Sequence, residues 1–252
     1  GGDPNFHISS FNGTTWTSNS ISSFTNIYEI AYNGNRYIVV GQGFISIAYS
    51  SDGTSWTGLG SSLFNQTNGM TFGNSLFIAV GISDTNTLAY SSDGLTWTGL
   101  GSTIFTSVGN DVTYNNQYFV AVGSGTNTIA YSTNGTLWVG LGTTIFTYYG
   151  KSVKYSGMYL LATGSGFNTL AYSMDGITWT IAGNVIFENY SWKVAYNGKT
   201  WIVTGEGVND YLMSSEDGIN WTGVSNSITN IFPAFAFVVP TAVPVPLAFC
   251  LS

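Results

Sequence analysis

The sequence has very little charge, and least of all positive charge. Charged residues make up 7% of the 252-residue chain, whereas roughly 25% is usual for a soluble domain. Twelve acidic residues outnumber five basic ones and give a net charge of −7. A protein that follows nucleic-acid phosphates needs clustered Lys and Arg, so we expect no nucleic-acid partner. The basic residues are Arg36, Lys151, Lys154, Lys193 and Lys199.

Cysteine and histidine are nearly absent as well. The single cysteine, Cys250, excludes a disulfide bond within the chain. The single histidine, His7, leaves no second ligand set for zinc and only one base for a Ser-His-Asp site. The "GSG" strings at 123–125 and 164–166 follow apolar runs and recur with a repeat, so they do not indicate a phosphate loop. We therefore expect no catalytic residues, no metal and no cofactor.

Long apolar helices are the third absence. No helical period of apolar residues persists along the chain. The most apolar stretch, 231–252, has the length of a membrane span but contains four prolines, which argue against a helix. We expect an all-β protein without membrane insertion. The prolines are Pro233, Pro240, Pro244 and Pro246.

A tryptophan repeat is what the sequence does contain. Six tryptophans follow one another at intervals of 40 to 42 residues. Four residues before each Trp is an Asp or Asn, followed by Gly, and two residues earlier again is a Ser. The box S-x-[DN]-G-x-x-W thus occurs six times. The tryptophans are Trp16, Trp56, Trp97, Trp138, Trp179 and Trp221, and the Asp or Asn residues are Asn12, Asp52, Asp93, Asn134, Asp175 and Asp217.

Short β-strands are predicted upstream of five of these boxes. Segments such as "EIAYNGNRYIVVGQG" and "KVAYNGKTWIVTGEG" read as strand, tight turn and strand, because β-branched and aromatic residues flank turn dipeptides. Together with the strands around the box they give four strands in about 41 residues, the period of a propeller blade. The sequence predicts a six-bladed β-propeller with four-stranded blades, in one domain over residues 1–252.

The first and last segments are expected to share a blade. The first box lacks preceding strands of its own, and the apolar residues near the end of the chain can supply them. We therefore expect 6–17 and 234–250 to combine in one blade that closes the ring and protects its edges, with 231–252 as closing strands or tail. Prolines there suit an edge strand or a bulge.

The box is similar to the Asp-box of BNR-type β-propellers, a motif shared by sialidases, several lectins and many secreted or virus-encoded proteins. The resemblance covers the chain from Ser10 to about Gly223. The usual box has one residue more between Asp and Gly, so the present one is a shortened variant. The resemblance implies the propeller fold more than any activity.

The box is interpreted as scaffold. An Asp or Asn side chain in a turn accepts hydrogen bonds from nearby backbone amides, Gly permits positive φ, and Ser closes the same loop. Each Trp is expected to pack between neighbouring blades. Asn at positions 12 and 134 keeps the turn but removes the charge that a metal site needs.

Function is therefore sought where the repeats differ. The resemblance implies a ligand face built by the loops that enter the innermost strand and by those that join the second and third strands. Equivalent positions there differ chemically from blade to blade, which suits a polar ligand such as a sugar; the alternative is that they are ordinary solvated turns. The first set comprises Tyr28, Glu29, Asn68, Asn110, Asp111, Lys151, Trp192 and Lys193, and the second comprises Asp84, Glu206 and Asp210.

Enzymatic activity is not expected. Sialidases, which the box resembles, bind the substrate carboxylate with three arginines, and this chain has only Arg36. Hydrolysis of a glycoside by a carboxylate pair, Asp111 with Glu29, is kept as a remote alternative.

Two functions are carried forward. The first is a non-catalytic propeller, extracellular or on a virion or cell surface, that binds a glycan or a surface receptor. The second is a structural subunit of a filament, fibre or surface layer, self-assembled through its tail or through the repeated "GLGSSLF", "GLGSTIF" and "GLGTTIF" loops. In a glycosylating compartment the sequons would act as glycan acceptors; they begin at Asn12, Asn65, Asn134, Asn189 and Asn220.

Overall fold

The computed structural model describes residues 6–10, 17–21, 23–182, 187, 190–206, 211–224 and 247–250. Strands and their connections account for all of these residues, and no helix occurs among them. The expected all-β class is thereby confirmed. Within the same residues there is also no helix long and apolar enough to span a membrane.

The chain divides into two compact units. The first comprises residues 1–102 and 238–252, and the second comprises residues 103–237. We describe each unit by itself. The single domain over residues 1–252 stays a prediction.

The first unit joins the two ends of the chain in one sheet. The central strand β1 (Phe6–Ser10) pairs antiparallel with β2 (Thr17–Ser20) on one side and with β23 (Leu247–Cys250) on the other. In this register His7 lies opposite Cys250. The expected sharing of a sheet by the two terminal segments is confirmed. The box at Asn12 and Trp16, and the residues from 225 to 246, lie outside the described residues.

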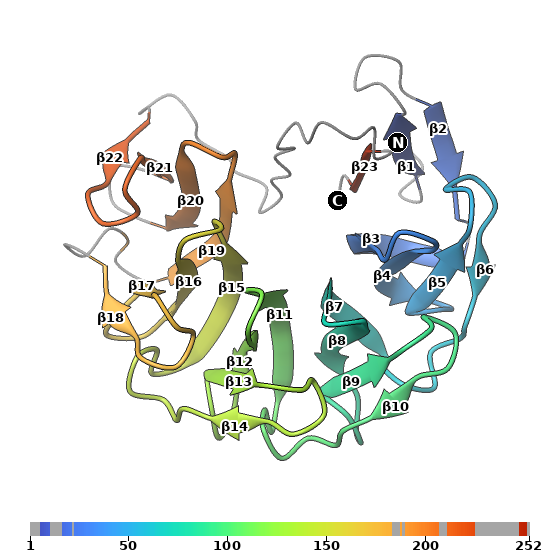
Figure 1. Ribbon diagram of the computed structural model, residues 1–252, viewed down its shortest axis with the longest axis horizontal. Coiled ribbons are helices and arrows are strands. Elements are labelled where there is room, and N and C mark those ends of the chain that lie inside the picture. Colours follow the sequence, from blue (N-terminus) through green and yellow to red (C-terminus); the bar gives the residue numbers. More distant parts are fainter. Residues whose placement is uncertain are drawn as a thin grey trace. The chain divides into compact units, whose positions relative to one another are not determined.

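Two four-stranded blades complete the first unit (Figure 1). In each blade every strand pairs antiparallel with the next one along the chain. The blades are β3 (Phe24–Tyr32), β4 (Tyr37–Gly43), β5 (Ile47–Ser50) and β6 (Thr57–Gly58), followed by β7 (Gln66–Gly73), β8 (Leu76–Ile82), β9 (Leu88–Ser91) and β10 (Thr98–Gly99).

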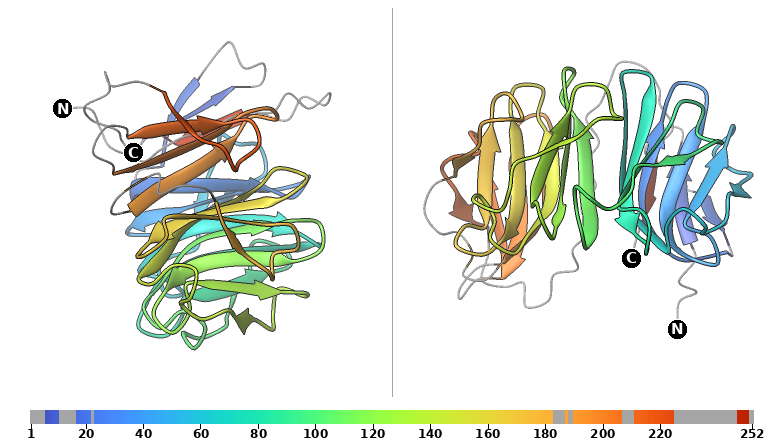
Figure 2. Two further views of the ribbon diagram at one scale, coloured as in Figure 1. Left: turned by 90° about the vertical axis from the view of Figure 1, so that its left-hand side faces the viewer. Right: turned by 90° about the horizontal axis from the view of Figure 1, so that it is seen from below.

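The second unit contains three blades of the same design, and Figure 2 shows their strands from two further sides. Their first strands, β11, β15 and β19, lie beside one another in that order. The blades are β11 (Val108–Tyr114), β12 (Phe119–Ser124), β13 (Ile129–Ser132) and β14 (Val139–Gly140); β15 (Tyr149–Tyr155), β16 (Leu160–Ser165), β17 (Leu170–Ser173) and β18 (Thr180–Ile181); and β19 (Tyr190–Tyr196), β20 (Trp201–Glu206), β21 (Leu212–Ser215) and β22 (Thr222–Gly223).

The apolar cores lie between consecutive blades. One cluster combines Val120 and Val122 of β12 with Leu160 of β16, and Trp179 packs against its margin. Trp97 and Trp221 occupy the same place in two further clusters. These box tryptophans therefore pack between neighbouring blades, as expected.

The box itself is a turn closed by its own side chains. In the fourth blade the backbone amides of Ile177 and Thr178 donate to Asp175 Oδ1 at 2.8 and 2.7 Å. Ser173 Oγ donates to the same carboxylate at 3.0 Å and accepts from the Gly176 amide at 2.8 Å, and Gly176 has a φ of +81°.

The Asn134 box makes the same amide bonds without a charge. The amides of Thr136 and Leu137 donate to Asn134 Oδ1 at 3.0 and 2.9 Å. A box therefore needs an oxygen acceptor at this position and no carboxylate charge, which supports the scaffold interpretation.

The connections between blades contain buried phenylalanine rings, here called wedges, which the sequence analysis does not predict. Four of these connections contain a phenylalanine that is described and only 0 or 1% exposed. Three of them, Phe64, Phe105 and Phe146, end the "GLGSSLF", "GLGSTIF" and "GLGTTIF" loops that are expected to offer contacts for self-assembly. Their rings are packed inside the chain's own core, so that part of the loops is not available to a partner. The residues are Phe64, Phe105, Phe146 and Phe187.

Candidate functional site

A β-bulge interrupts the first strand of each of the five blades at the same position. The register shifts fall between Ile27 and Glu29, and at four equivalent pairs in the other blades. A bulge places an extra residue against the partner strand and re-aims its side chain. Most of the residues expected on the ligand face are at or beside these bulges: Tyr28, Glu29, Asn68, Asn110, Asp111, Lys151, Trp192 and Lys193.

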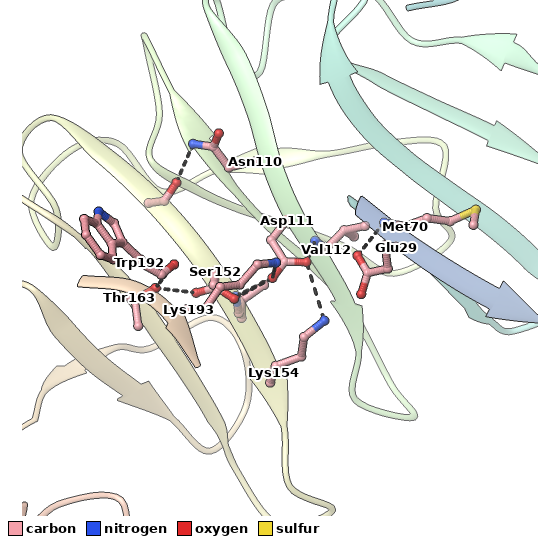
Figure 3. Close-up of polar contacts among 12 residues, drawn as sticks. Glu29, Met70, Asn110, Asp111, Val112, Ser152, Lys154, Thr163, Trp192 and Lys193 are labelled. Carbon is pink, nitrogen blue, oxygen red and sulfur yellow. Dashed lines mark hydrogen bonds and ion pairs between the residues drawn. The ribbon is translucent and has the colours of Figure 1, made fainter. Parts of the chain in front are cut away.

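In the first unit the bulge side chains bind their neighbours. The Tyr28 hydroxyl donates to Gln42 Oε1 at 3.1 Å, and Asn68 Oδ1 accepts from Gln66 Nε2 at 2.6 Å. Glu29 Oε2 accepts from the Met70 amide at 3.0 Å and so links β3 to β7. This contact is drawn in Figure 3. The remaining candidate of this unit, Asp84, is exposed in the loop between β8 and β9.

Asp111 in the second unit is fully buried, and this corrects the expectation that it contacts a ligand. Its Oδ2 accepts from Ser152 Oγ at 2.7 Å and from the Val153 amide at 3.1 Å (Figure 3). Its Oδ1 accepts from the Val112 amide at 2.9 Å. Asp111 thus links β11 to β15, in the way that Glu29 links β3 to β7. Both residues stand directly after the bulge, and the sequence alone does not show that side chains at this position bond the next blade.

Two lysines flank the Asp111 carboxylate. Lys154 Nζ lies 3.6 Å from Oδ1 and Lys193 Nζ lies 3.8 Å from Oδ2. Burial alone would raise the pKa of Asp111, but the charges of Lys154 and Lys193 and the hydrogen bonds outweigh it and lower that pKa. Asp111 is therefore ionised at neutral pH. The acid of a glycosidase carboxylate pair must instead be held protonated, so Asp111 is unsuited to that role.

Lys151 is the member of this group that makes no direct contact. Within the described residues no hydrogen bond or ion pair engages its ammonium group. The residue is exposed overall, yet surrounding atoms displace part of its hydration, and this desolvation, together with the charge of Lys193, lowers the pKa of Lys151. Lys151 is thus an exposed residue whose charge is repelled by that of Lys193 and attracted by that of Asp111.

Trp192 occupies the equivalent bulge on the next strand. Its ring pairs with that of Tyr190, with ring centroids 5.5 Å apart and an interplanar angle of 36°. Thr163 Oγ1 donates to the Trp192 carbonyl at 3.3 Å and holds the bulge backbone. On the other side of Lys151, Asn110 Nδ2 donates to the Gly150 carbonyl at 2.8 Å. The rim residues Asn110, Lys151 and Trp192 come from three consecutive blades.

Glu206, at the end of β20, is partly buried and close to Tyr190. A hydrogen bond between the two side chains is the main cause that raises the pKa of the Tyr190 hydroxyl. Asp210, the last candidate, lies outside the described residues. Sequence reasoning had not selected Tyr190 or Lys154. For Lys154 a signal existed, since three of the five bases fall on the first strands of two neighbouring repeats.

No group of three or more His, Cys, Asp or Glu side chains that could hold a metal ion occurs in the described ranges. The candidate site comprises the rim residues Asn110, Lys151 and Trp192, the Tyr190 ring, and the lysines around buried Asp111.

Comparisons with known proteins show the fold of this chain and nothing beyond it. No family model matches the sequence, and no curated protein matches it. Among solved structures the chain is similar to the GH74 enzyme of Niastella koreensis, with a TM-score of 0.56 and 21% identity over 79% of this chain. The chain spans 30% of the length of that enzyme.

Two further structures are similar over more of their length. One is from the nidogen/laminin complex, with a TM-score of 0.58, 12% identity and coverage of 84% of this chain and 89% of the other. The second is YCF48 from Cyanidioschyzon merolae, with a TM-score of 0.58, 16% identity and coverage of 84% and 75%. These similarities and the bladed sheets establish the β-propeller fold.

Proposed function

We propose that this β-propeller is a non-catalytic binding protein that holds a polar ligand, best a surface glycan, at the bulge rim of its second unit. The observation that carries the proposal is the pairing of Lys151 and Trp192. They stand at equivalent bulges on the neighbouring strands β15 and β19, where Lys151 is exposed and Trp192 is half-buried.

This combination matches the chemistry of a sugar. A sugar ring has apolar C–H faces that pack on an aromatic ring, and hydroxyls that need directed donors and acceptors. Trp192 with Tyr190 supplies the aromatic surface. Lys151 supplies donors, and the backbone bonds at Asn110 and Thr163 fix the strands that carry them. Rigid strands hold such groups more exactly in place than free loops do.

The carboxylates support a binding role over a hydrolytic one. Asp111 is buried and ionised, and Glu29 is bonded to a backbone amide. Neither is placed as a proton donor for a glycosidic oxygen. The similarity to the GH74 enzyme is a similarity of fold at 21% identity, and it is no evidence that this chain has the activity of that enzyme.

An extracellular, virion-surface or cell-surface location fits the composition. With 7% charged residues, the surface must be wetted mainly by hydroxyl and amide groups. A glycan or a glycosylated surface receptor is the partner that we propose.

A glycan array tests this proposal. We expect the purified protein to bind a subset of glycans, and Trp192→Ala to abolish that binding because it removes the aromatic surface. Leu137→Ala is the matched control, because Leu137 is also apolar and is 74% exposed in a box turn. Absence of binding to every glycan, or equal loss in both variants, contradicts the proposal.

Self-assembly is a second candidate, favoured by apolar side chains on the outermost strands. Val139 of β14 and Ile181 of β18 are each 50% exposed at the edge of their blades. We expect light scattering to detect oligomers that Val139→Lys and Ile181→Lys disperse. A monodisperse wild-type monomer at high concentration would rule out this candidate.

A further inference from the structure

We propose that the ligand is an acidic saccharide, and that Lys151 and Lys193 together bind its carboxylate or sulfate group. This inference rests on the proposed function and narrows its ligand class.

Positive charge is concentrated at this rim in an otherwise acidic chain. Three of the five basic residues stand on β15 and β19, and among the described residues of the second unit Asp111 is the carboxylate that forms ion pairs with two of them, Lys154 and Lys193. Asp111 is shared between Lys154 and Lys193 at 3.6 and 3.8 Å. Its single charge is thus divided between two ammonium groups, and Lys151 adds a third.

Lys151 is the group that gains most from an anion. Desolvation and the charge of Lys193 disfavour its ammonium form and outweigh the opposing attraction of Asp111, so the pKa of Lys151 is lowered. An anion lying between the two lysines would replace lost hydration with charge-assisted hydrogen bonds and cancel their repulsion. Because no described side chain already engages Lys151, such a ligand displaces no existing partner.

The neighbouring aromatic ring favours a saccharide as the carrier of the anion. Trp192 directly precedes Lys193, and its ring is braced by Tyr190. An acidic sugar presents one charged group and one apolar face, which match one lysine pair and one indole. A nucleic acid presents a phosphate at every nucleotide, and a chain with a net charge of −7 repels such a polymer beyond this small rim.

Asp111 acts here as a positioning residue. It does not touch the ligand, because its side chain is fully buried. Its ionised carboxylate holds the Lys193 ammonium group at 3.8 Å and so fixes one of the two donors.

The experiment uses paired glycans on one surface: neutral oligosaccharides, the same chains with a uronic or sialic acid carboxylate, and the same chains with an O-sulfate. We expect the acidic members to bind and the neutral ones to bind weakly. Lys151→Gln should weaken acidic binding by about tenfold, the usual effect of losing a hydrogen bond to a charged group. Lys151→Arg keeps the charge and should retain most of the affinity.

Two controls separate this inference from the proposed function. Lys199→Gln removes a lysine that is 78% exposed and paired with Glu216 at 3.3 Å, and it should leave binding unchanged. Trp192→Ala should weaken neutral and acidic glycans alike. Thermal unfolding of each variant verifies that it is folded.

Each outcome decides the inference. Preference for carboxylated or sulfated glycans, lost in Lys151→Gln, supports it and identifies the acid group. Equal binding of neutral and acidic glycans, unaffected by Lys151→Gln, overturns it but leaves the proposed function standing. Binding to no glycan overturns both, and equally tight binding of duplex DNA overturns the saccharide class.

Discussion

Phe146 packs directly against the backbone of Gly164: a β-carbon at residue 164 would lie 2.4 Å from Phe146 Cγ. The same relationship joins Phe105 to Gly123 and Phe187 to Gly205, each with a distance of 2.6 Å to the ring Cγ. Glycine is required in these strands because any side chain would overlap the ring. These three connections between blades are thereby anchored in the core, each through a phenylalanine ring that packs against a glycine.

The Phe146 wedge should dominate local stability. We expect Phe146→Ala to lower the free energy of unfolding by about 3–5 kcal/mol, the range for emptying a buried aromatic site. Phe167→Ala is the matched control, since the same substitution at a side chain that is 88% exposed should change it by less than about 0.5 kcal/mol. Urea unfolding measures both. Equal losses would contradict the wedge role.

The box turn should tolerate asparagine, but not alanine, in place of its aspartate. Asp175→Ala leaves the Ile177 and Thr178 amides without their acceptor, and we expect a loss of about 1–2 kcal/mol. Asp175→Asn keeps the oxygen, as Asn134 does in its own box, so the loss should stay below about 0.5 kcal/mol. Urea unfolding distinguishes the two variants. A large loss in the Asn variant would mean that the charge itself matters.

Acid should destabilise the protein through the same turns. Amide hydrogen bonds lower the pKa of the Asp52, Asp93 and Asp217 carboxyls, and at Asp175 they outweigh the opposing effect of burial. A carboxyl with a lowered folded pKa contributes stability above its unfolded pKa of about 3.9, and this stability is lost as pH falls through the folded value. We expect unfolding free energy to be flat near pH 6 and to decrease below about pH 4.

Chemical unfolding at pH 6 and pH 3 tests the acid dependence. Replacing all four of these aspartates by Asn should flatten the dependence, because Asn accepts the same amide bonds without titrating. An unchanged slope in that variant would assign acid sensitivity to other carboxyls, of which buried Asp111 is the foremost.

The strands and the boxes could be predicted from the sequence because they are periodic and local. An Asp followed by Gly, four residues before Trp, fixes a turn through bonds within six residues, as at Asp175. The buried wedge was missed although its signal was present. Phe64, Phe105 and Phe146 recur every 41 residues, but each ends a string of Gly, Ser and Thr residues that is typical of a surface loop.

The site was only partly predictable because it depends on contacts between blades. The sequence shows that residues near the start of the innermost strands differ from blade to blade, and the structure places a bulge there; that these positions bind a ligand stays a prediction. Whether a bulge side chain faces solvent or the next blade depends on packing across about 40 residues of chain, as Asp111 and Ser152 demonstrate. Repeat alignment pairs Asp111 with Ser152 and Asn110 with Lys151, but it does not show that the first two side chains are buried and bonded to each other.

Asp111 should be worth far more to stability than a surface ion pair. Asp111→Ala leaves Ser152 Oγ and the Val153 amide without their buried acceptor and removes the counter-ion of two lysines. We expect unfolding free energy to decrease by about 2–4 kcal/mol. Glu216→Ala is the control, because it breaks an exposed pair with Lys199 and should cost about 0.5 kcal/mol or less. Urea unfolding compares the two, and similar losses would mean that Asp111 does not hold β11 to β15.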